Sequence, residues 1–577
     1  MKKLLRYLRG YYKESVLAPL FKMLEATFEL IVPLVMASII DVGIANKDEA
    51  YIWKMCLVMV ALGVIGLVCS LTAQYFAAKA AMGFSTALRK NMFAHINTLS
   101  YRELDVLGTP TLVTRITSDI NQAQTGVNLV LRLFLRSPFI VVGAVIMAFA
   151  IDVKVSVIFF IAVPLISVVI YWIMKWTVPI YKKVQSMLDR ISLITRENHV
   201  GARVVRAFGR QREEMEDFTE ANEAFTQIQV KAGKISALLN PATYVIMNLS
   251  IVAILVYGGH GVDSGRISQG QVVALVNYMT QILLALLALA NLIVAVTKAT
   301  ASASRLNEVF ETATTLEEKG DDILAQDGPA DVEFSHVTFT YANASQPSLE
   351  DITFRAEGGE TIGIIGGTGS GKSTLVNLIP RFYDVQQGTV KVGNRPVDAY
   401  SFRGLRGQIG IVPQHAVLFA GTIRENMQWG KRDATDDEIY RALEIAQARE
   451  FVDAKPEKLD TMIHQGGSNL SGGQRQRLTI ARALVGSPKV LILDDSASAL
   501  DFATDAALRH AIKSQTKGMT VFLVSQRASS IKQSDRILVL DDGLLAGWGT
   551  HKELLQNCPV YREICLSQLS EQEVNRP

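Results

Sequence analysis

Cysteine is scarce in this chain of 577 residues, and opposite charges nearly balance. The four cysteines show neither a metal-ligand spacing nor a disulfide framework, which argues against a cysteine-stapled extracellular fold. A net charge of +3, from 58 basic and 55 acidic residues, provides no basic field for a nucleic acid. The basic N-terminus is not followed by a short apolar core with a small-residue cleavage site, so we expect no removable signal peptide.

Charged residues make up only 20% of the chain, and the mean hydropathy is +0.23. Such values in so long a chain predict a membrane part joined to a soluble part. Six apolar segments approach the roughly 20 residues that a spanning helix needs. They lie near residues 16–40, 54–80, 127–150, 153–175, 236–258 and 271–296. Loops 81–126 and 176–235 are long and rich in Arg and Lys, which predicts that these loops and both termini are cytoplasmic.

Both long loops keep a helical periodicity, so the spanning helices are expected to continue into the cytoplasm. Each loop holds a short amphipathic segment, Gly108–Asp119 in the first and Glu197–Gln211 in the second. Apolar side chains occur where a free loop would be polar, which favours docking onto a soluble domain over a solvated connection. These side chains are Leu112, Val113, Val204, Val205 and Phe208.

Polar residues inside the spans are few and are therefore candidates for a substrate cavity. Glu25 and Glu29 lie one helical turn apart in the first span, and Asn277 and Gln281 repeat this spacing in the last. Glu25 could instead pair with Lys22 near the inner interface. The two amides could instead form inter-helix hydrogen bonds.

The soluble half begins after a polar segment, so we divide the chain into a transmembrane domain (1–310), a linker (311–330) and an α/β domain (331–577). An apolar strand enters a glycine-rich loop that opens a helix and matches G-x-x-x-x-G-K-S. This loop predicts binding of Mg-ATP, with backbone amides and a lysine on the phosphates and a serine hydroxyl on Mg²⁺. Its residues are Gly366, Gly367, Thr368, Gly369, Ser370, Gly371, Lys372, Ser373 and the adjacent Thr374.

Further motifs surround this P-loop. Tyr341 precedes it and is placed to stack on a base, whereas Gln414 follows a later strand. The stretch LSGGQ opens a predicted helix and offers a second phosphate-binding surface through Ser471, Gly472, Gly473 and Gln474. The apolar strand that follows ends in Asp494 and Asp495.

In this order, behind six spanning helices, the motifs resemble an ATP-binding cassette (ABC) half-transporter of the exporter type over essentially the whole chain. The resemblance implies a multi-pass protein of a bacterial inner membrane and a dimer whose cassettes sandwich two ATPs. Each ATP would lie between one chain's P-loop and the other chain's LSGGQ. By the same resemblance Gln414 senses the γ-phosphate and the metal, Asp494 helps to hold Mg²⁺, and Asp501 crosses the dimer interface.

Three positions depart from the family pattern. Asp495 stands where the catalytic glutamate is usual, and its side chain is about 1.5 Å shorter; a misplacement of about 1 Å can cost on the order of 10²-fold in rate. Gln526 stands where a histidine is usual and cannot carry a charge. Gln465 also replaces a glutamate that often precedes LSGGQ. We therefore predict the degenerate-site half of a heterodimeric exporter, which lends its intact LSGGQ to the competent site of a different chain.

Three other interpretations remain open on the sequence. The chain could form a homodimer with two slow sites, or an ATP-gated channel or regulator; a fused spanning region argues against an importer cassette. The sequence shows no N-terminal cysteine-peptidase domain, which disfavours an exporter of leader peptides. The resemblance makes amphiphilic drugs the leading cargo class, with lipids and peptides as alternatives.

Overall fold

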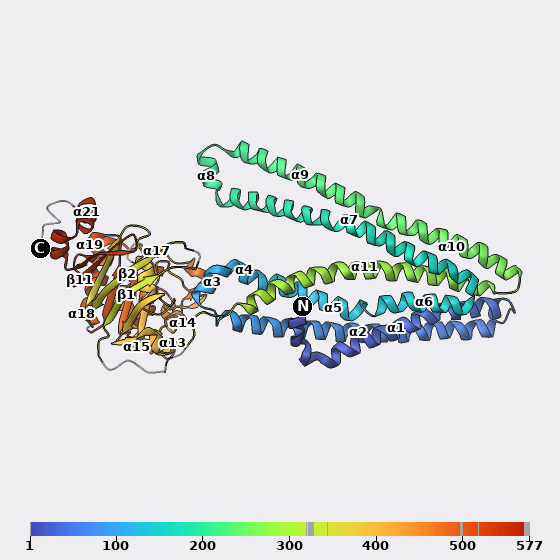
Figure 1. The fold of residues 1–577 in the computed structure, drawn as a ribbon. Coiled ribbons are helices and arrows are strands. Elements are labelled where there is room, and N and C mark those ends of the chain that lie inside the picture. The colour runs from blue at the N-terminus through green and yellow to red at the C-terminus, as the bar shows by residue number, and fades with distance from the viewer. Residues whose placement is uncertain are drawn as a thin grey trace. The chain divides into compact units, whose positions relative to one another are not determined.

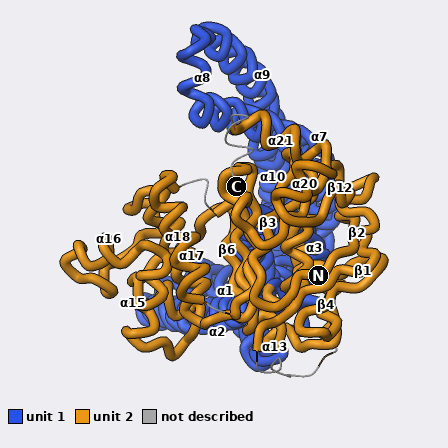
Figure 2. The backbone as a smooth tube through the Cα atoms, turned by 90° about the vertical axis from the view of Figure 1, so that its left-hand side faces the viewer, with its two compact units in different colours: residues 1–96, 110–311 blue, residues 97–109, 312–577 orange. Residues whose placement is uncertain are grey.

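The computed structural model describes residues 2–318, 320, 328–342, 344–496, 500–516 and 518–569. The chain forms two compact units (Figure 2). Unit 1 comprises Met1–Ile96 and Pro110–Glu311, and unit 2 comprises Asn97–Thr109 and Thr312–Pro577. The short segment 97–109, which our division by chain order placed in the membrane half, thus groups with the soluble half. Most of residues 319–327, within the predicted linker, lie outside the described residues.

Unit 1 is helical throughout its regular structure. Its elements are η1 (Lys2–Tyr11), α1 (Tyr12–Ser38), η2 (Ile39–Ile44), α2 (Glu49–Ile96), α4 (Thr109–Thr114), η3 (Arg115–Asp119), α5 (Ile120–Leu133), α6 (Arg136–Ile151), α7 (Val153–Val200), α8 (Ala202–Ala207), α9 (Gln211–Ala237), α10 (Leu239–Asp263) and α11 (Gln269–Glu311). Among the described residues, six continuous helical stretches are long and apolar enough to span a membrane, which agrees with the predicted number.

These helices are much longer than a bilayer requires. The stretch Val153–Val200 has 48 residues, about 72 Å at 1.5 Å per residue, whereas a hydrocarbon core is about 30 Å thick. The helix α7 runs beside α9 and α10, and α8 connects the two arms of this hairpin (Figure 1). The expected extension of the spanning helices beyond the bilayer is therefore confirmed.

Side-chain size separates the two faces of the spanning helices. Ala73 and Ala77 of α2 are fully buried against neighbouring helices, because small side chains let helix backbones approach closely. Large apolar side chains point outward: Trp53 is 76% exposed and Phe160 is 71% exposed. Such exposure is unfavourable in water but is suited to lipid.

Unit 2 is built on strands. A six-stranded sheet has the order β12-β11-β3-β10-β9-β6, a four-stranded sheet has the order β2-β1-β4-β5, and β7 pairs with β8. The strands are β1 (Val332–Phe339), β2 (Leu349–Ala356), β3 (Thr361–Gly366), β4 (Gln387–Val392), β5 (Arg395–Pro396), β6 (Ile409–Val412), β7 (Gly421–Thr422), β8 (Met462–Ile463), β9 (Val490–Asp494), β10 (Thr520–Val524), β11 (Arg536–Asp541) and β12 (Leu544–Gly549).

Unit 2 also contains helices. The first, α3, belongs to segment 97–109, and the others lie around the sheets (Figure 1). They are α3 (Tyr101–Leu107), α12 (Lys372–Leu378), α13 (Phe402–Arg406), α14 (Ile423–Met427), α15 (Asp436–Ile445), α16 (Arg449–Asp453), α17 (Gly472–Leu484), α18 (Phe502–Gln515), α19 (Ala528–Ile531), α20 (His551–Asn557) and α21 (Pro559–Gln568), with short turns η4 (Val397–Ala399), η5 (Lys458–Asp460) and η6 (Gln465–Gly467).

Successive side chains of the central strands point to opposite faces of the sheet, and each face packs in its own hydrophobic core. In β10, Val521 and Leu523 join a core with α15, α17 and α18, whereas Phe522 and Val524 face the four-stranded sheet. Both sets are buried, as expected for central strands that are covered on both faces. The α/β class predicted for the soluble half is therefore confirmed.

The sheet also brings the predicted motifs to one edge. Strands β3, β10, β9 and β6 are parallel, so their carboxyl ends meet at the same side. The P-loop follows β3, Asp495 follows β9, Gln526 follows β10 and Gln414 follows β6. In open α/β sheets a ligand binds beyond these carboxyl ends, and this edge is therefore the candidate nucleotide site.

Candidate nucleotide site and the membrane charge cluster

The P-loop has the backbone that its glycines permit. Gly369 and Gly371 adopt positive φ angles of 86° and 92°, which side-chain-bearing residues rarely adopt. A Cβ on Gly367 would meet no atom within 4 Å, so the space over this loop is open. The Lys372 ammonium donates to the carbonyls of Gly366 (3.0 Å) and Gly367 (2.5 Å), and burial lowers its pKa. Lys372 is thus held inside the loop, where phosphates would replace these carbonyls.

The metal-binding candidates lie together across the sheet edge. The hydroxyl of Ser373 donates to Oδ1 of Asp494 at 3.0 Å. Burial raises the pKa of Asp494, although the Ser373 hydroxyl opposes this effect. A hydroxyl and a carboxylate are the oxygen ligands that Mg²⁺ prefers. The residues present therefore fit a nucleotide-bound Mg²⁺.

Asp495 has an unusual backbone. Its φ is +45°, in the left-handed region that is uncommon for a residue other than glycine. Its N–H donates to the Val524 carbonyl at 3.1 Å, which ties the end of β9 to the end of β10. Burial raises the pKa of its carboxyl, while a hydrogen bond from Gln414 lowers it. Gln414 thus contacts the residue that occupies the catalytic position.

Gln526 is exposed and lies two residues after the end of β10. Its carbonyl accepts a hydrogen bond from Nε2 of Gln568 at 2.8 Å, and Oε1 of the same side chain accepts from the Ala528 N–H at 2.8 Å. Gln568, at the end of α21, therefore fixes the backbone on both sides of Arg527. Gln568 was not predicted as a site residue, because no sequence motif links α21 to the segment after β10.

The LSGGQ segment is the N-terminus of α17. Ser471 and Gln474 form a reciprocal capping box, in which Ser471 Oγ accepts from the Gln474 N–H at 3.2 Å. A Cβ on Gly472 would meet nothing within 4 Å. Among the described residues, no hydrogen bond joins Ser471–Gln474 to the P-loop. Gly473 lies within the first turn of α17. This surface is therefore open in one chain.

Asp501 is the N-cap of α18. It accepts from the N–H of Thr504 at 2.9 Å and from its hydroxyl at 2.8 Å, and these bonds lower the pKa of Asp501. The side chain is exposed. Residues 497–499, shortly before Asp501, lie outside the described residues.

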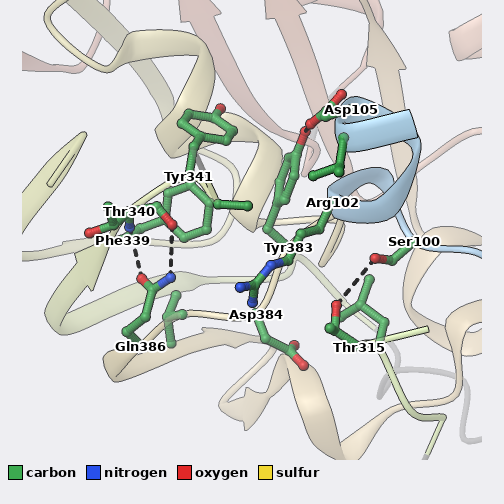
Figure 3. Close-up of a pocket in the computed structure, with 14 residues that line it drawn as sticks. Ser100, Arg102, Asp105, Thr315, Phe339, Thr340, Tyr341, Tyr383, Asp384 and Gln386 are labelled. Carbon is green, nitrogen blue, oxygen red and sulfur yellow. Dashed lines mark hydrogen bonds between the residues drawn. The ribbon is translucent and has the colours of Figure 1, made fainter. Parts of the chain in front are cut away.

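Tyr341 lies beside the P-loop, in contact with a second tyrosine (Figure 3). Its hydroxyl donates to Thr374 Oγ1 at 3.2 Å, and its ring packs edge-on against Tyr383 at a centroid distance of 5.3 Å. The Tyr383 hydroxyl donates to Oδ2 of Asp105 on α3 at 2.7 Å. The pKa of Tyr383 is strongly raised, mainly by burial and secondly by this hydrogen bond. These residues line a cavity of about 240 Å³.

The helix α3 is the part of the first long loop that joins unit 2. It begins with a capping box formed by Ser100 and Glu103, and Oε1 of Glu103 also accepts from Thr315 at 2.8 Å. Tyr101 packs on Phe382 at a centroid distance of 4.6 Å. The sequence analysis placed the amphipathic segment after Gly108 instead. Residues 110–119 belong to unit 1, where Leu112 is buried and Val113 is 54% exposed.

The second amphipathic segment forms α8 within unit 1. Val204 is 60% exposed and Phe208 is 76% exposed, whereas Val205 is half-buried. Among the described residues of unit 1, none covers these two large side chains. Docking of this segment onto another domain stays a prediction.

The polar residues of the spans form internal pairs. The Lys22 ammonium lies 2.6 Å from Oε2 of Glu25, and Arg136 Nη2 lies 2.8 Å from Oε2 of Glu29. The Arg136 Nε also lies 4.0 Å from Oε1 of Glu25. The pairing of Glu25 with Lys22, our alternative interpretation, is confirmed. Arg136 was missed, because its helix is not adjacent to α1 in the chain.

The two amides behave differently. Gln281 Nε2 donates to the Glu29 carbonyl on α1 at 3.2 Å, which is the inter-helix bond that we considered. Asn277 donates to the Val273 carbonyl within its own helix at 3.0 Å. An inter-helix bond is thus observed for Gln281 only. Neither observation tests whether these residues line a substrate cavity.

The fold and this site define a class of protein: a membrane-spanning P-loop ATPase. The chain matches the family description "ABC transporter transmembrane region" over residues 15–286 and "ABC transporter" over residues 349–498. It belongs to the ABC transporter family, as a half-transporter that carries a transmembrane domain and a nucleotide-binding domain in one polypeptide.

Relatives span nearly the whole chain. The uncharacterized ABC transporter ATP-binding protein YfiB of Bacillus subtilis is 37% identical and covers 98% of both chains. The ATP-dependent lipid A-core flippase of Hahella chejuensis is 30% identical over 99% of this chain and 97% of its own. The probable multidrug resistance ABC transporter ATP-binding/permease protein YheI of Bacillus subtilis is 33% identical over 82% of this chain and 81% of its own.

A solved structure shows the same fold. The bacterial Atm1-family ABC exporter with ATP bound superposes with a TM-score of 0.79, at 24% identity, and the match covers 97% of this chain and 98% of that chain. The six-helix transmembrane domain and the α/β nucleotide-binding domain are therefore arranged along the chain as in an ABC exporter.

Proposed function

We propose that this chain is the degenerate-site subunit of a heterodimeric exporter in a bacterial inner membrane. Its own P-loop binds Mg-ATP with little hydrolysis, and its LSGGQ completes the competent site on a different half-transporter. The observation that carries the proposal is Asp495. It occupies the catalytic position with a side chain one methylene short of glutamate, and it is held by Gln414 and by the Val524 carbonyl.

The binding half of the site has all of its parts. Lys372 is positioned inside the loop, and Ser373 lies against Asp494. Bound Mg²⁺ would neutralise charge on the phosphates. Asp495 and Gln526 supply neither the reach of a glutamate nor the charge of a histidine. Nucleotide binding and hydrolysis are thereby separated in one site, so bound ATP acts mainly as a clamp between the cassettes.

The proposed cargo is an amphiphile, a drug or a lipid. Two relatives support this class, since one is named a lipid A-core flippase and another a probable multidrug resistance transporter. Glu25 and Glu29 would favour cationic cargo if they were unpaired, but both carboxylates have basic partners. These paired carboxylates therefore give no reason to expect a preference for cationic cargo.

The proposal predicts long retention of nucleotide. With the heterodimer in lipid nanodiscs, labelled Mg-ATP on this chain should persist intact through many turnovers of the partner site. Lys372→Ala should abolish this retention, because the ammonium contacts the phosphates. Hydrolysis and exchange at this chain's site at the partner's rate would contradict the proposal. Rapid ATP turnover by the purified chain alone would favour the homodimer.

A further inference from the structure

A groove between α18 and α19 forms a second cavity of the nucleotide-binding domain, of about 440 Å³. Its floor is apolar and is formed by Leu493, Val521 and Leu523 of the central strands. No P-loop residue lines it. This volume lies within the range of about 300–1,000 Å³ that is typical of small-molecule sites.

The walls of the groove carry positive charge. The basic lining residues are Arg509, His510, Lys513 and Lys532, and no described lining residue is acidic. Asp505 pairs with Arg509 at 3.1 Å, and Asp535 pairs with Lys513 at 3.4 Å. Lys532 makes no ion pair within the described part of the chain. After these internal pairs are counted, Lys532 remains as one cationic group in excess.

Two polar atoms in this lining are buried without a hydrogen-bond partner among the described residues: Nε of Arg509 and Oγ of Ser534. The rest of the Arg509 guanidinium is occupied, since Nη2 contacts Asp505 and Nη1 donates to the Ser530 carbonyl at 3.2 Å. Buried polar atoms are usually hydrogen-bonded, so an orphaned donor in a cavity wall indicates a missing acceptor.

We propose that this groove binds a small organic oxyanion, in which a phosphate, sulfonate or carboxylate group is attached to a flat apolar body. The Arg509 Nε–H, the Ser534 hydroxyl and the Lys532 ammonium are the donors for the oxyanion. Leu493, Val521 and Leu523 contact the apolar body. This site lies within unit 2, includes no P-loop residue and does not depend on the exporter proposal.

The location of the groove gives the ligand a regulatory role. The helix α18 begins directly after Asp501, and α19 begins two residues after Gln526. Arg509 on α18 already joins the two helices, because its Nη1 donates to the Ser530 carbonyl on α19. A ligand between them restricts the two segments that reach the ATP sites, and it therefore changes the ATPase rate without entering the P-loop.

Binding is tested with radiolabelled phenyl phosphate and the full-length chain in lipid nanodiscs, by equilibrium dialysis. Saturating Mg-ATP fills the P-loop, so that the probe cannot bind there. We expect saturable binding. The combined variant Lys532→Gln, Ser534→Ala should weaken it at least about tenfold, because it removes one charged and one neutral donor. The matched control Lys552→Gln, Ser567→Ala, on α20 and α21, should bind like the wild type.

Two further compounds separate the parts of the ligand. Benzyl alcohol has the ring without the anion, and inorganic phosphate has the anion without the ring; both should bind more weakly than phenyl phosphate. Equal binding of inorganic phosphate would overturn the apolar part of the proposal. Equal binding of phenyl phosphate to the combined variant, or no saturable binding to the wild type, would overturn the site. If the combined variant does not fold, Lys532→Gln alone provides the same comparison.

Discussion

At the scale of single residues, most of the candidate nucleotide site could be predicted from the sequence. The P-loop and Gln414 follow parallel strands of one sheet, and Asp494 ends another. A motif of fixed spacing locates the P-loop without a structure. The sequence could not reveal the left-handed backbone of Asp495 or the Gln568 clamp on the segment after β10. Both depend on where distant parts of the chain fold back.

A stability effect follows from the burial of Asp494. Burial raises its pKa above the ordinary value of 3.8, so its charged form destabilises the folded domain. The cost is present at pH 7 and disappears as the pH falls below that ordinary value. Asp494→Asn should therefore raise the melting temperature of the nucleotide-free protein at pH 7.

The same variant should bind Mg-ATP at least about 10- to 100-fold more weakly, the loss typical even for a residue behind a metal ligand. Differential scanning fluorimetry with and without Mg-ATP measures both effects. As a control, Asp433→Asn changes a carboxylate outside the candidate nucleotide site. A lower melting temperature of the nucleotide-free Asp494→Asn protein would contradict the account.

At the scale of elements, the sequence predicted the six spans and the α/β class. The part of the first long loop that groups with unit 2 is 97–109, which ends where the predicted docking segment begins, and docking of that segment stays a prediction. Gly108 and Pro110 mark a break in the first long loop, which favoured a docking segment in the residues after them. The informative signal was Ser100 with Glu103, a capping box that starts α3 immediately before this punctuation. The contacts of α3 with Phe382 and Tyr383 could not be predicted from the sequence. More than 270 residues separate the partners, as in the Tyr383–Asp105 hydrogen bond.

The Tyr383 hydroxyl is expected to couple the nucleotide-binding domain to this loop. Tyr383→Phe keeps the ring against Tyr341 and removes only the hydrogen bond to Asp105. Transport per ATP hydrolysed should fall, since changes along a coupling element typically alter coupling by about 0.5–2 kcal/mol. Retention of ATP should be unchanged.

Tyr440→Phe removes a hydroxyl from α15, away from α3, and serves as the control. Vesicle uptake and ATPase assays measured on the same preparation give the ratio. A parallel fall in both rates for Tyr383→Phe would show a general defect rather than lost coupling.

The charged residues of the spans should stabilise helix packing rather than select cargo. Changing Glu25 and Glu29 to glutamine leaves Lys22 and Arg136 without their carboxylates. The cost should be below the roughly 3–5 kcal/mol of breaking a fully buried pair, because Glu29 is partly exposed. Transport of cationic and neutral amphiphiles should fall equally, whereas Glu223→Gln on α9 should have no effect. A selective loss of cationic cargo would contradict this assignment.

At the scale of the whole molecule, we propose that one chain carries two unequal halves of ATP chemistry. Its LSGGQ segment is intact and open, whereas its own catalytic position is altered. The ABC transporter family explains why both features can serve one machine, since its exporters work as dimers. The asymmetry stays a prediction from Asp495 and Gln526, and no feature of a single chain can identify the partner.

The most direct test compares Gly472→Leu with Asp495→Ala in the ATPase activity of the heterodimer. A Cβ at position 472 would meet no atom within 4 Å, so a substitution there should act mainly on the facing nucleotide. At about 1.4 kcal/mol per tenfold change in rate, we expect Gly472→Leu to cost at least two such steps and Asp495→Ala well under one. Equal loss of activity in the two variants would show that Asp495 is a working base and would contradict the degenerate-site account.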